Sequence, residues 1–378
     1  MNPETRLLLI GGGHSHLEVM RRFGLERPAH IELTLVSASP RHHYSGMVPG
    51  FLRGTYSEEE ISFDLAPLSA AVAARFITEA AVGLDPGART VMLASGRSVP
   101  YDVVSFGVGS TPAGGDRAEV ARHAAVVKPM SRAVELRKKL LELAQQGTSS
   151  TRQHVVVVGG GAAGVEVALA AAAVLDEAAR PRQVSLVEAR EQILSGYSAP
   201  FRRRAELVLA SEGIAVRTGR RAVAVHADHL ELEDGVTLPS GLTVWLTGGV
   251  AYPLFQDSEL ALDERGFLLI DDSLRSISDP RVLAAGDCGT LVNYPETPKA
   301  GVYAVRQGPL LWESLKATIS GRDPPRYRPQ RGFLSILNTC DGKALVRYRG
   351  IVSHSVWAWW LKDWIDRRFM KKYKALTK

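Results

Sequence analysis

Cysteine is scarce in this chain, which has two, Cys288 and Cys340, among 378 residues. Neither belongs to a CxxC pair, and no set of Cys and His residues has the spacing of a zinc site. Because no partner cysteine is spaced for thiol–disulfide exchange, Cys288 is expected to be a small packed thiol rather than a nucleophile. The sequence therefore predicts neither a redox-active disulfide nor a bound metal ion.

Long hydrophobic runs are missing as well. No stretch of about 18 uncharged apolar residues occurs, so we expect no transmembrane helix. The apolar residues near the N-terminus are too few for a signal peptide, and no cleavage region follows them, so we expect a cytoplasmic protein. A content of 45% hydrophobic and 23% charged residues, without low-complexity tracts, is typical of a folded chain of two or three domains.

The charge balance is positive, with a formal net charge of +6 at pH 7. Such an excess suits an anionic partner, which could be a nucleotide or an anionic membrane surface. The basic residues follow no nucleic-acid motif, so we expect no nucleic-acid partner.

A glycine-rich turn lies near the N-terminus. The apolar run Leu7–Ile10 predicts a buried strand, the glycines 11–13 follow at once, and the pattern then becomes helical. Strand, glycine turn and helix begin a dinucleotide-binding βαβ unit, in which the backbone passes close to a pyrophosphate and the helix N-terminus attracts its charge. Two positions depart from the usual fingerprint. His16 replaces its last glycine, and Ser37 replaces the acid that follows the second strand, Ile31–Val36.

A second unit of this kind is more complete. His154–Val158 predicts a buried strand, an alanine-rich helix follows, and the strand Gln183–Val187 ends at Glu188. The fingerprint glycines are Gly159, Gly161 and Gly164. A carboxylate at Glu188 accepts hydrogen bonds from both ribose hydroxyls and repels a 2′-phosphate, which favours NADH over NADPH. Arg190 favours the opposite choice, because an arginine can pair with that phosphate.

Other polar residues and glycines lie where strands end or helices begin. Glu166, in the first turn of the second unit's helix, either complements the helix dipole or lies beside the nicotinamide. Asp287 ends the segment VLAAGD, where it either binds a ligand hydroxyl or caps the next helix. Gly109, in SFGVGSTP, brings backbone near a ligand or belongs to a plain turn, and Gly248 ends a strand that faces the same crevice.

Shorter elements are expected between these units. Phe76–Leu84, Arg89–Leu93 and Val103–Val108 alternate or run apolar and predict strands. Ser131–Gln146 predicts a helix, for which Ser131 is a candidate cap.

The C-terminal segment 356–378 is rich in tryptophan and basic residues. At helical spacing, one face carries Trp357, Trp360, Leu361, Trp364 and Ile365, whereas Lys362, Asp363, Asp366 and Arg367 lie off it. Tryptophan beside lysine and arginine is typical of a helix that lies in a membrane interface. The alternative is that the tryptophans close the protein's own core.

The two fingerprints, SFGVGST and AGDC occur in an order that resembles the two-dinucleotide-binding flavoproteins of the pyridine nucleotide-disulfide oxidoreductase superfamily. Its members include type II NADH dehydrogenases and sulfide:quinone reductases. GGGHSHLEV, YSGMVPG, KAGVYAVRQGP and KDWIDRRFM resemble most closely the flavoprotein module found alone or fused to selenide,water dikinase. That resemblance runs almost end to end, and within this module His16 and Ser37 are usual.

The resemblance implies an α/β fold with two Rossmann-like domains, the NAD(P)H domain inserted in the FAD domain. The expected ranges are 1–115 and 253–328 for FAD, 116–252 for NAD(P)H, and 329–378 for a small C-terminal region. The implied FAD site comprises Gly11, Gly13, His14, Ser15, His16, Ser37, Arg41, Gly109, Asp287, Lys299 and Ala300. The implied NAD(P)H site comprises Gly159, Gly161, Gly164, Glu166, Glu188 and Gly248. Glu166 and Lys299 are the expected catalytic residues.

The implied activity is an FAD-dependent NAD(P)H dehydrogenase that passes electrons from NADH through the flavin to an acceptor, with a quinone as the first candidate. Lys128 and Lys299 are candidates to stabilise negative charge on the reduced flavin. One alternative is a soluble NAD(P)H-dependent flavoenzyme that acts on a sulfur or selenium compound, and another is a non-catalytic FAD-binding redox sensor. Peripheral contact with the inner face of the cell membrane and a homodimer are further expectations.

Overall fold

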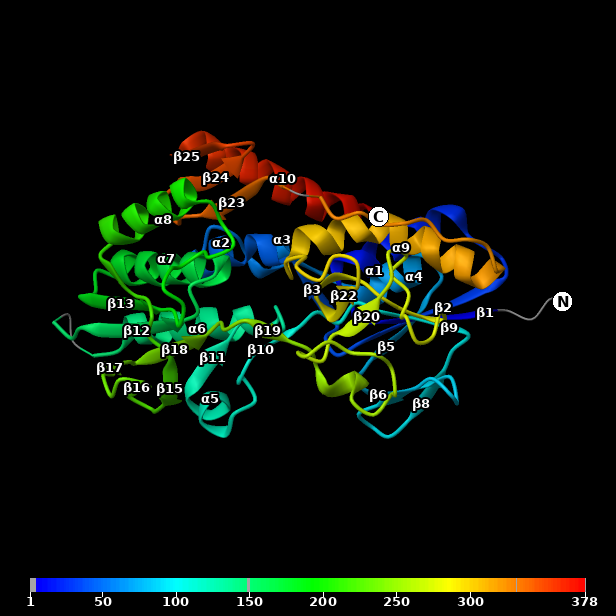
Figure 1. The fold of residues 1–378 in the computed structure, drawn as a ribbon. Coiled ribbons are helices and arrows are strands. Elements are labelled where there is room, and N and C mark those ends of the chain that lie inside the picture. Colours follow the sequence, from blue (N-terminus) through cyan, green and yellow to red (C-terminus); the bar gives the residue numbers. More distant parts are fainter. Residues whose placement is uncertain (1–4, 148–149, 331, 378) are drawn as a thin grey trace.

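The computed structural model describes residues 5–147, 150–330 and 332–377. Its first sheet has the order β21-β9-β1-β2-β5, and all neighbouring strands in it are parallel. The strands are β1 (Thr5–Ile10), β2 (Ile31–Ser37), β5 (Arg75–Thr78), β9 (Val103–Phe106) and β21 (Val282–Ala284). Parallel sheets are buried on both faces, which explains why β1 is a continuous apolar run. Helices α1 (His14–Glu26) and α9 (Gly301–Ser320) pack side by side over this sheet (Figure 1).

The second sheet is also parallel and has the order β11-β18-β12-β13-β14. Its strands are β11 (Ala124–Val126), β12 (Gln153–Val158), β13 (Arg182–Val187), β14 (Ile214–Arg217) and β18 (Leu242–Trp245). The helices of this unit are α5 (Ala118–His123), α6 (Arg132–Gln145), α7 (Ala162–Glu177) and α8 (Ala199–Ser211). Because the chain builds this sheet between β9 and β21, the second unit is inserted in the first, which confirms the expected fold class. The boundaries at residues 115, 252 and 328 stay predictions.

Small antiparallel sheets and short pairs complete the two units. They comprise β6 (Ala81–Asp85), β7 (Thr90–Leu93) and β8 (Ser98–Pro100), then β15 (Ala222–Val225), β16 (His229–Leu232) and β17 (Thr237–Pro239). The pairs are β3 (Arg41–His43) with β4 (Ser62–Asp64), β10 (Thr111–Pro112) with β19 (Gly249–Val250), and β20 (Leu268–Ile270) with β22 (Gly289–Leu291). Short helices are α2 (Val48–Arg53), α3 (Glu58–Ile61), α4 (Leu65–Ala71) and the 3-10 turns 45–47, 253–255, 286–288 and 375–377.

Two local expectations need correction. The expected strand Phe76–Leu84 is two strands, because β5 joins the first sheet whereas β6 pairs with β7 in a separate antiparallel sheet. Ser131 precedes α6 at its N-cap position, but its side chain makes no capping hydrogen bond to any residue that the structure describes. The helix α6 itself matches the expected range to within one residue at each end.

The C-terminal region consists of the antiparallel strands β23 (Ser335–Asn338), β24 (Ala344–Tyr348) and β25 (Ile351–Ser355), followed by α10 (Val356–Lys374). In Figure 1, α10 runs along the top of the molecule, from above the second unit to the first unit. Its inner face buries Ala358, Lys362, Asp366, Met370 and Tyr373. Trp357, Trp360 and Trp364 are 53%, 61% and 57% exposed, so they do not close the core. No helix in the described ranges is both long and apolar enough to cross a membrane.

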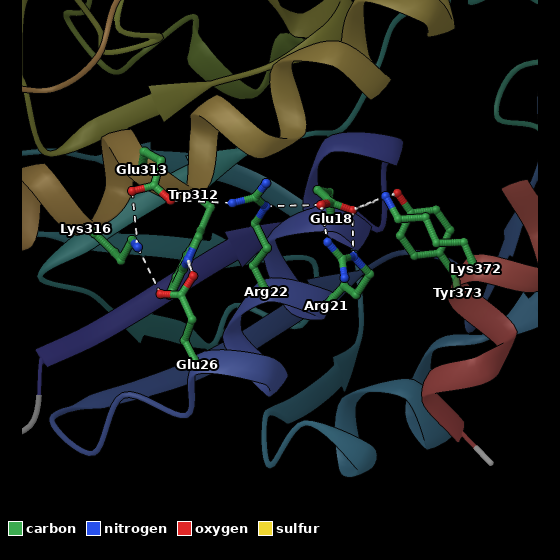
Figure 2. Close-up of polar contacts among 9 residues, drawn as sticks. All are labelled: Glu18, Arg21, Arg22, Glu26, Trp312, Glu313, Lys316, Lys372 and Tyr373. Carbon is green, nitrogen blue, oxygen red and sulfur yellow. Dashed lines mark hydrogen bonds and ion pairs between the residues drawn. The ribbon is translucent and has the colours of Figure 1, made fainter.

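Ion pairs fix the end of α10 to α1 (Figure 2). The buried carboxylate of Glu18, on α1, accepts hydrogen bonds from Arg21 at 2.8 Å and from Lys372 of α10 at 2.6 Å. The Tyr373 hydroxyl donates to the same carboxylate at 3.2 Å. The C-terminal helix is therefore anchored to the helix that follows the first glycine turn.

Candidate functional site

One large cavity, of about 1390 Å³, connects the carboxyl ends of the two parallel sheets. Its wall includes the glycine turns at 11–13 and 159–161 and the segments that follow β2, β9, β13 and β18. Ligands of open α/β sheets bind at this edge, where strand order reverses. The volume exceeds that of a typical pocket for one small ligand, so the cavity has room for more than one nucleotide.

The first glycine turn leaves no space for side chains on its inner side. Gly11 has φ +93°, and a Cβ there would lie 2.7 Å from the carbonyl oxygen of Gly107. A Cβ at Gly13 would collide with the same oxygen. Within the described residues, no side chain caps α1, so its first N–H groups are available to a ligand. This cradle fits a pyrophosphate.

His16 lies behind this turn and is not among the residues on the cavity wall, so its place in the FAD site stays a prediction. Its Nδ1 is 2.6 Å from the Gly11 carbonyl oxygen, and its Nε2 is 2.9 Å from the Ser105 hydroxyl. Burial lowers the pKa of His16 to about 4, so the ring is neutral at pH 7. The imidazole thus occupies space that a glycine at position 16 would leave empty, and its two hydrogen bonds hold it against the turn.

The other residues expected at the first site all line the cavity: Gly11, Gly13, His14, Ser15, Ser37, Arg41, Gly109, Asp287, Lys299 and Ala300. Ser37 ends β2, and its hydroxyl donates to the Ser39 carbonyl at 2.8 Å, so it shapes the loop that follows the strand. Arg41 pairs with Asp64 at 2.7 Å and with Glu58 at 3.0 Å. The guanidinium is therefore held in place at this end of the cavity.

The second glycine turn is equally tight. Gly159 has φ +115°, and a Cβ there would collide with the carbonyl of Leu246, whereas a Cβ at Gly164 would collide with that of Gly159. Glu188 follows β13, and its carboxylate accepts hydrogen bonds from Gly160 N–H at 2.7 Å and Arg190 N–H at 2.9 Å. All six residues expected at this site line the cavity: Gly159, Gly161, Gly164, Glu166, Glu188 and Gly248.

Asp287 lies between the two sites, in the turn after β21. Its Oδ2 accepts hydrogen bonds from Lys128 Nζ at 2.8 Å and from the Ser110 hydroxyl at 3.0 Å. Burial acts to raise the pKa of Asp287, but the charge and hydrogen bond of Lys128, the Ser110 hydroxyl and the charge of Lys299 together outweigh it, and the pKa lies below its ordinary value. The carboxylate is therefore ionised at pH 7 and can accept hydrogen bonds from ligand hydroxyls.

Glu166 connects the cavity to the C-terminal region. It lines the cavity from α7, and its Oε1 accepts a hydrogen bond from Asn338 N–H of β23 at 2.7 Å. Desolvation raises the pKa of Glu166 to about 7, so the carboxyl is near half-protonated at neutral pH. Lys362 of α10, whose charge acts on Glu166, donates to Gly46 O at 2.6 Å and to Asp366 at 2.8 Å.

Sequence reasoning missed the buried pair Lys362–Asp366 and the role of Ser110. The pair had a signal, an i, i+4 spacing of opposite charges, but such spacing is more common on a solvated helix face. Ser110 directly follows Gly109 in a segment that the sequence places near a ligand or in a plain turn. Nothing in the sequence indicated that its hydroxyl would donate a hydrogen bond to Asp287.

Comparisons with known proteins identify relatives of this architecture. A family model described as pyridine nucleotide-disulphide oxidoreductase matches residues 5–308. An NADH dehydrogenase-like protein of Mycobacterium tuberculosis is 28% identical over 75% of this chain and 72% of its own length. The type II NADH:quinone oxidoreductase of that organism is 22% identical over 93% of this chain and 82% of its own.

Among solved structures, the sulfide:quinone oxidoreductase of Aquifex aeolicus is similar in fold. It aligns with a TM-score of 0.82 at 19% identity, over 98% of this chain and 92% of its own. The match to the family model covers most of the sequence and confirms the resemblance, the fold class and the enzyme class, an oxidoreductase. The chain belongs to the pyridine nucleotide-disulphide oxidoreductase family.

Proposed function

We propose that this chain is an FAD-dependent NAD(P)H dehydrogenase that passes electrons from NADH through the flavin to a quinone. The observation that carries the proposal is the single cavity into which both glycine turns open. Two dinucleotides held by these turns share one cavity, so their reactive rings can meet in it. The cofactors supply the redox chemistry, which is hydride transfer from NADH to the flavin and transfer of two electrons onward.

The first turn and Asp287 suit FAD. Gly11 and Gly13 let the backbone approach the pyrophosphate, and the N-terminus of α1 stabilises its charge. The ionised carboxylate of Asp287 binds hydroxyls of the ribityl chain, and Lys128 holds that carboxylate in place. Ser37 and Arg41 lie at the adenosine end, and Ala300 and Lys299 near the flavin ring.

The second turn and Glu188 suit a pyridine nucleotide. Gly159, Gly161 and Gly164 form its pyrophosphate cradle at the start of α7. Glu188 follows β13 at the position where a carboxylate binds the ribose hydroxyls, so NADH is the expected substrate. Gly248 also lines the cavity, and because it has no side chain it leaves space for the nucleotide there.

The electrons pass from the flavin directly to a small acceptor, because this chain offers no dithiol to receive them. Both cysteines are free, and Cys288 and Cys340 are only 1% and 4% exposed. Burial also raises the pKa of the Cys288 thiol, which disfavours the nucleophilic thiolate. Two similar proteins, the type II NADH:quinone oxidoreductase and the sulfide:quinone oxidoreductase, are named for a quinone acceptor, which supports the same acceptor class here.

Glu166 is the residue on the cavity wall best suited to hold a proton for this reaction. Reduction of a quinone by NADH takes up one proton in addition to the hydride, so a group that is protonated near pH 7 is needed close by. The pKa of Glu166, raised to about 7, meets that requirement, and the N–H of Asn338 fixes its Oε1.

The C-terminal region provides a surface for peripheral contact with the inner face of a cytoplasmic membrane. Trp357, Trp360 and Trp364 project from α10 beside the exposed residues Ile351 and Val356. Basic side chains lie among the aromatic ones, with Arg368 stacked over Trp364 and Arg349 over Tyr348. Tryptophans flanked by arginines suit the interface of a membrane with anionic lipids.

An anaerobic titration of the purified holoenzyme with NADH tests the proposed activity. Flavin absorbance near about 450 nm should bleach with one equivalent of NADH and recover when a soluble quinone is added. Bleaching without recovery by quinone would favour the alternative of a sulfur or selenium acceptor, which is then added in the same cell. If neither NADH nor NADPH bleaches the bound flavin, the proposed dehydrogenase activity is wrong, and the alternative of a non-catalytic redox sensor gains support.

A further inference from the structure

A chain of hydrogen bonds runs from the cofactor cavity to a partly exposed carboxylate, that of Asp263. It begins at Lys299, which lines the cavity just before α9. Lys299 Nζ donates to the Thr290 hydroxyl oxygen at 2.9 Å, and this hydroxyl donates to Asp263 Oδ2 at 2.7 Å. Thr290 is buried on β22, whereas Asp263 is partly exposed in the turn before β20.

We propose that Lys299, Thr290 and Asp263 form a path by which a proton passes between solvent and the cofactor cavity. The proposal rests on the proposed function, because that reaction requires one proton from solvent for each quinone reduced. It assigns Lys299 as the group that resupplies the proton to the cavity after Glu166 has given one to the acceptor, and Thr290 and Asp263 as its connection to water.

Apolar side chains also lie beside the path. Phe267 is fully buried, and the Lys299 ammonium lies 4.1 Å from the centre of its ring. Cys288, also buried, lies in the turn before β22. The Thr290 hydroxyl is therefore the polar link between the lysine and the carboxylate on the far side.

The electrostatics let Lys299 change its protonation state. Burial lowers the pKa of Lys299 to about 8, so both the charged and the neutral amine are accessible near neutral pH. The groups that face it are Cys288, Asp263, Asp287 and Arg265, of which the first three favour the charged form and Arg265 opposes it. Gly289 O also accepts a hydrogen bond from its Nζ at 2.5 Å, which fixes the amine at the end of the path.

The proton balance is closed. NADH, one proton and a quinone yield NAD⁺ and a quinol, with two electrons and one hydrogen nucleus leaving NADH as hydride. Lys299 first releases its proton into the cavity, where it restores the proton that Glu166 has given to the quinone. The neutral amine then accepts the Thr290 hydroxyl proton while the Thr290 oxygen takes a proton that Asp263 has received from water, so both hydrogen bonds reverse their resting donor direction during this step. Asp263, Thr290 and Lys299 each return to their starting state after one turnover.

Two variants at one position separate a proton path from a structural contact. T290V keeps the shape of the side chain and removes the hydroxyl, which breaks the path. T290S keeps the hydroxyl and removes a methyl group, so it is the matched control. D263N keeps an oxygen to accept the N–H bonds of Arg265 and Phe267 at 2.9 and 3.0 Å, but its amide cannot carry the proton.

The test is a stopped-flow pH jump on the oxidised holoenzyme saturated with NAD⁺, which occupies the second site without reducing the flavin and limits direct exchange of Lys299 with water in the cavity. The jump from about pH 7 to about pH 9 deprotonates Lys299, and flavin absorbance or fluorescence reports the lost charge. K299M, which has no titrating amine, should abolish the signal and so identify its source. We expect the wild type and T290S to respond at the same rate. The response of T290V and D263N should be at least about tenfold slower.

The path is refuted if T290V responds as fast as T290S, or if the wild type gives no signal that K299M removes. Because the pH jump involves no turnover, its outcome is independent of the proposed activity. If NADH does not bleach the flavin of the wild-type enzyme, the proposed dehydrogenase activity is contradicted, whereas the pH-jump result for the path still stands. Flavin content of each variant, measured first, shows that it retains the cofactor.

Discussion

Asp287 lies where the first sheet's edge meets the second unit, and its carboxylate is the first-site group best placed to bind hydroxyls. Replacing it with alanine removes charge-assisted hydrogen bonds that are worth about 1.5–3 kcal/mol, so FAD should bind roughly ten- to a hundredfold more weakly. The ratio of flavin to protein after dialysis measures this. Asp257, an exposed aspartate, serves as the control when changed to alanine. Normal flavin content in D287A would contradict the assignment.

Glu188 sets the choice of nucleotide in our proposal. In E188Q the repulsion of a 2′-phosphate is gone, and Arg190, whose Nη1 contacts Ser195 at 2.6 Å, is near enough in sequence to attract that phosphate. The ratio of kcat/KM for NADH to that for NADPH should fall about tenfold, equivalent to about 1.4 kcal/mol. Glu191, which does not line the cavity, is the control as E191Q. An unchanged ratio in E188Q would show that this carboxylate does not discriminate.

Glu166 should impose a pH dependence on acceptor reduction. A carboxyl with a pKa of about 7 is protonated below that pH, so a step that needs its proton slows as the pH rises through about 7. E166Q cannot donate a proton, and its rate of quinone reduction should be low and independent of pH in this range. Bleaching of the flavin by NADH, which needs no proton from Glu166, should remain. If E166Q shows the same pH dependence as the wild type, the fall in the rate of quinone reduction near pH 7 is due to another group.

At the scale of the element, α10 depends on its anchors. Burial opposes ionisation of Glu18, yet hydrogen bonds from Arg21 and Lys372 lower its pKa to about 2. A depressed carboxyl pKa contributes stability above the ordinary value of about 4.3, and that contribution is lost as the pH falls from there towards about 2. Acidification should therefore release the end of α10 within this window (Figure 2).

The matching variant is E18Q. Removing one charge from a buried ion-pair network costs about 3–5 kcal/mol, and we expect the lower end because Lys372 is 44% exposed. Urea unfolding at pH 7 gives the total loss, and hydrogen exchange of residues 356–374 shows whether α10 opens first. Glu313, whose ion pairs lie at the surface, is the control as E313Q and should cost far less. Equal losses in the two variants would mean that Glu18 is not a special anchor.

Elements built on strong local patterns were predictable from the sequence, and those decided by long-range pairing were not. The glycine turns at Gly11 and Gly159 follow from backbone geometry that other residues cannot adopt. The break between β5 and β6 could not be seen, because residues 76–84 read as one apolar stretch and only pairing with β2 or β7 divides them. Lys362 and Asp366 were placed off the apolar face, but their burial depends on the distant carbonyl of Gly46.

At the scale of the whole molecule, α10 and the β23–β25 sheet join the two nucleotide-binding units. Asn338 N–H binds Glu166 of the second unit, and Lys362 and Lys372 bind Gly46 and Glu18 of the first. The polar inner face of α10 is thus fully used by the protein, which leaves its tryptophans on the outside. Because its inner contacts are made within the protein, the outer face of α10, where tryptophans lie among basic side chains, is available to bind another surface.

The membrane proposal predicts that the wild-type enzyme sediments with vesicles that contain anionic lipid, and less so with neutral vesicles or at high salt. Serine at Trp357, Trp360 and Trp364 together should weaken this binding about a hundredfold or more, because each indole then loses its burial in the interface. Leu25, 67% exposed on α1, is the control as L25S. Sedimentation velocity in the absence of lipid measures the oligomeric state and tests the alternative that the tryptophans form a dimer interface. If the wild type is a dimer that the tryptophan variant dissociates, and neither binds vesicles, this face is an interface between two copies of the chain and the membrane proposal is wrong.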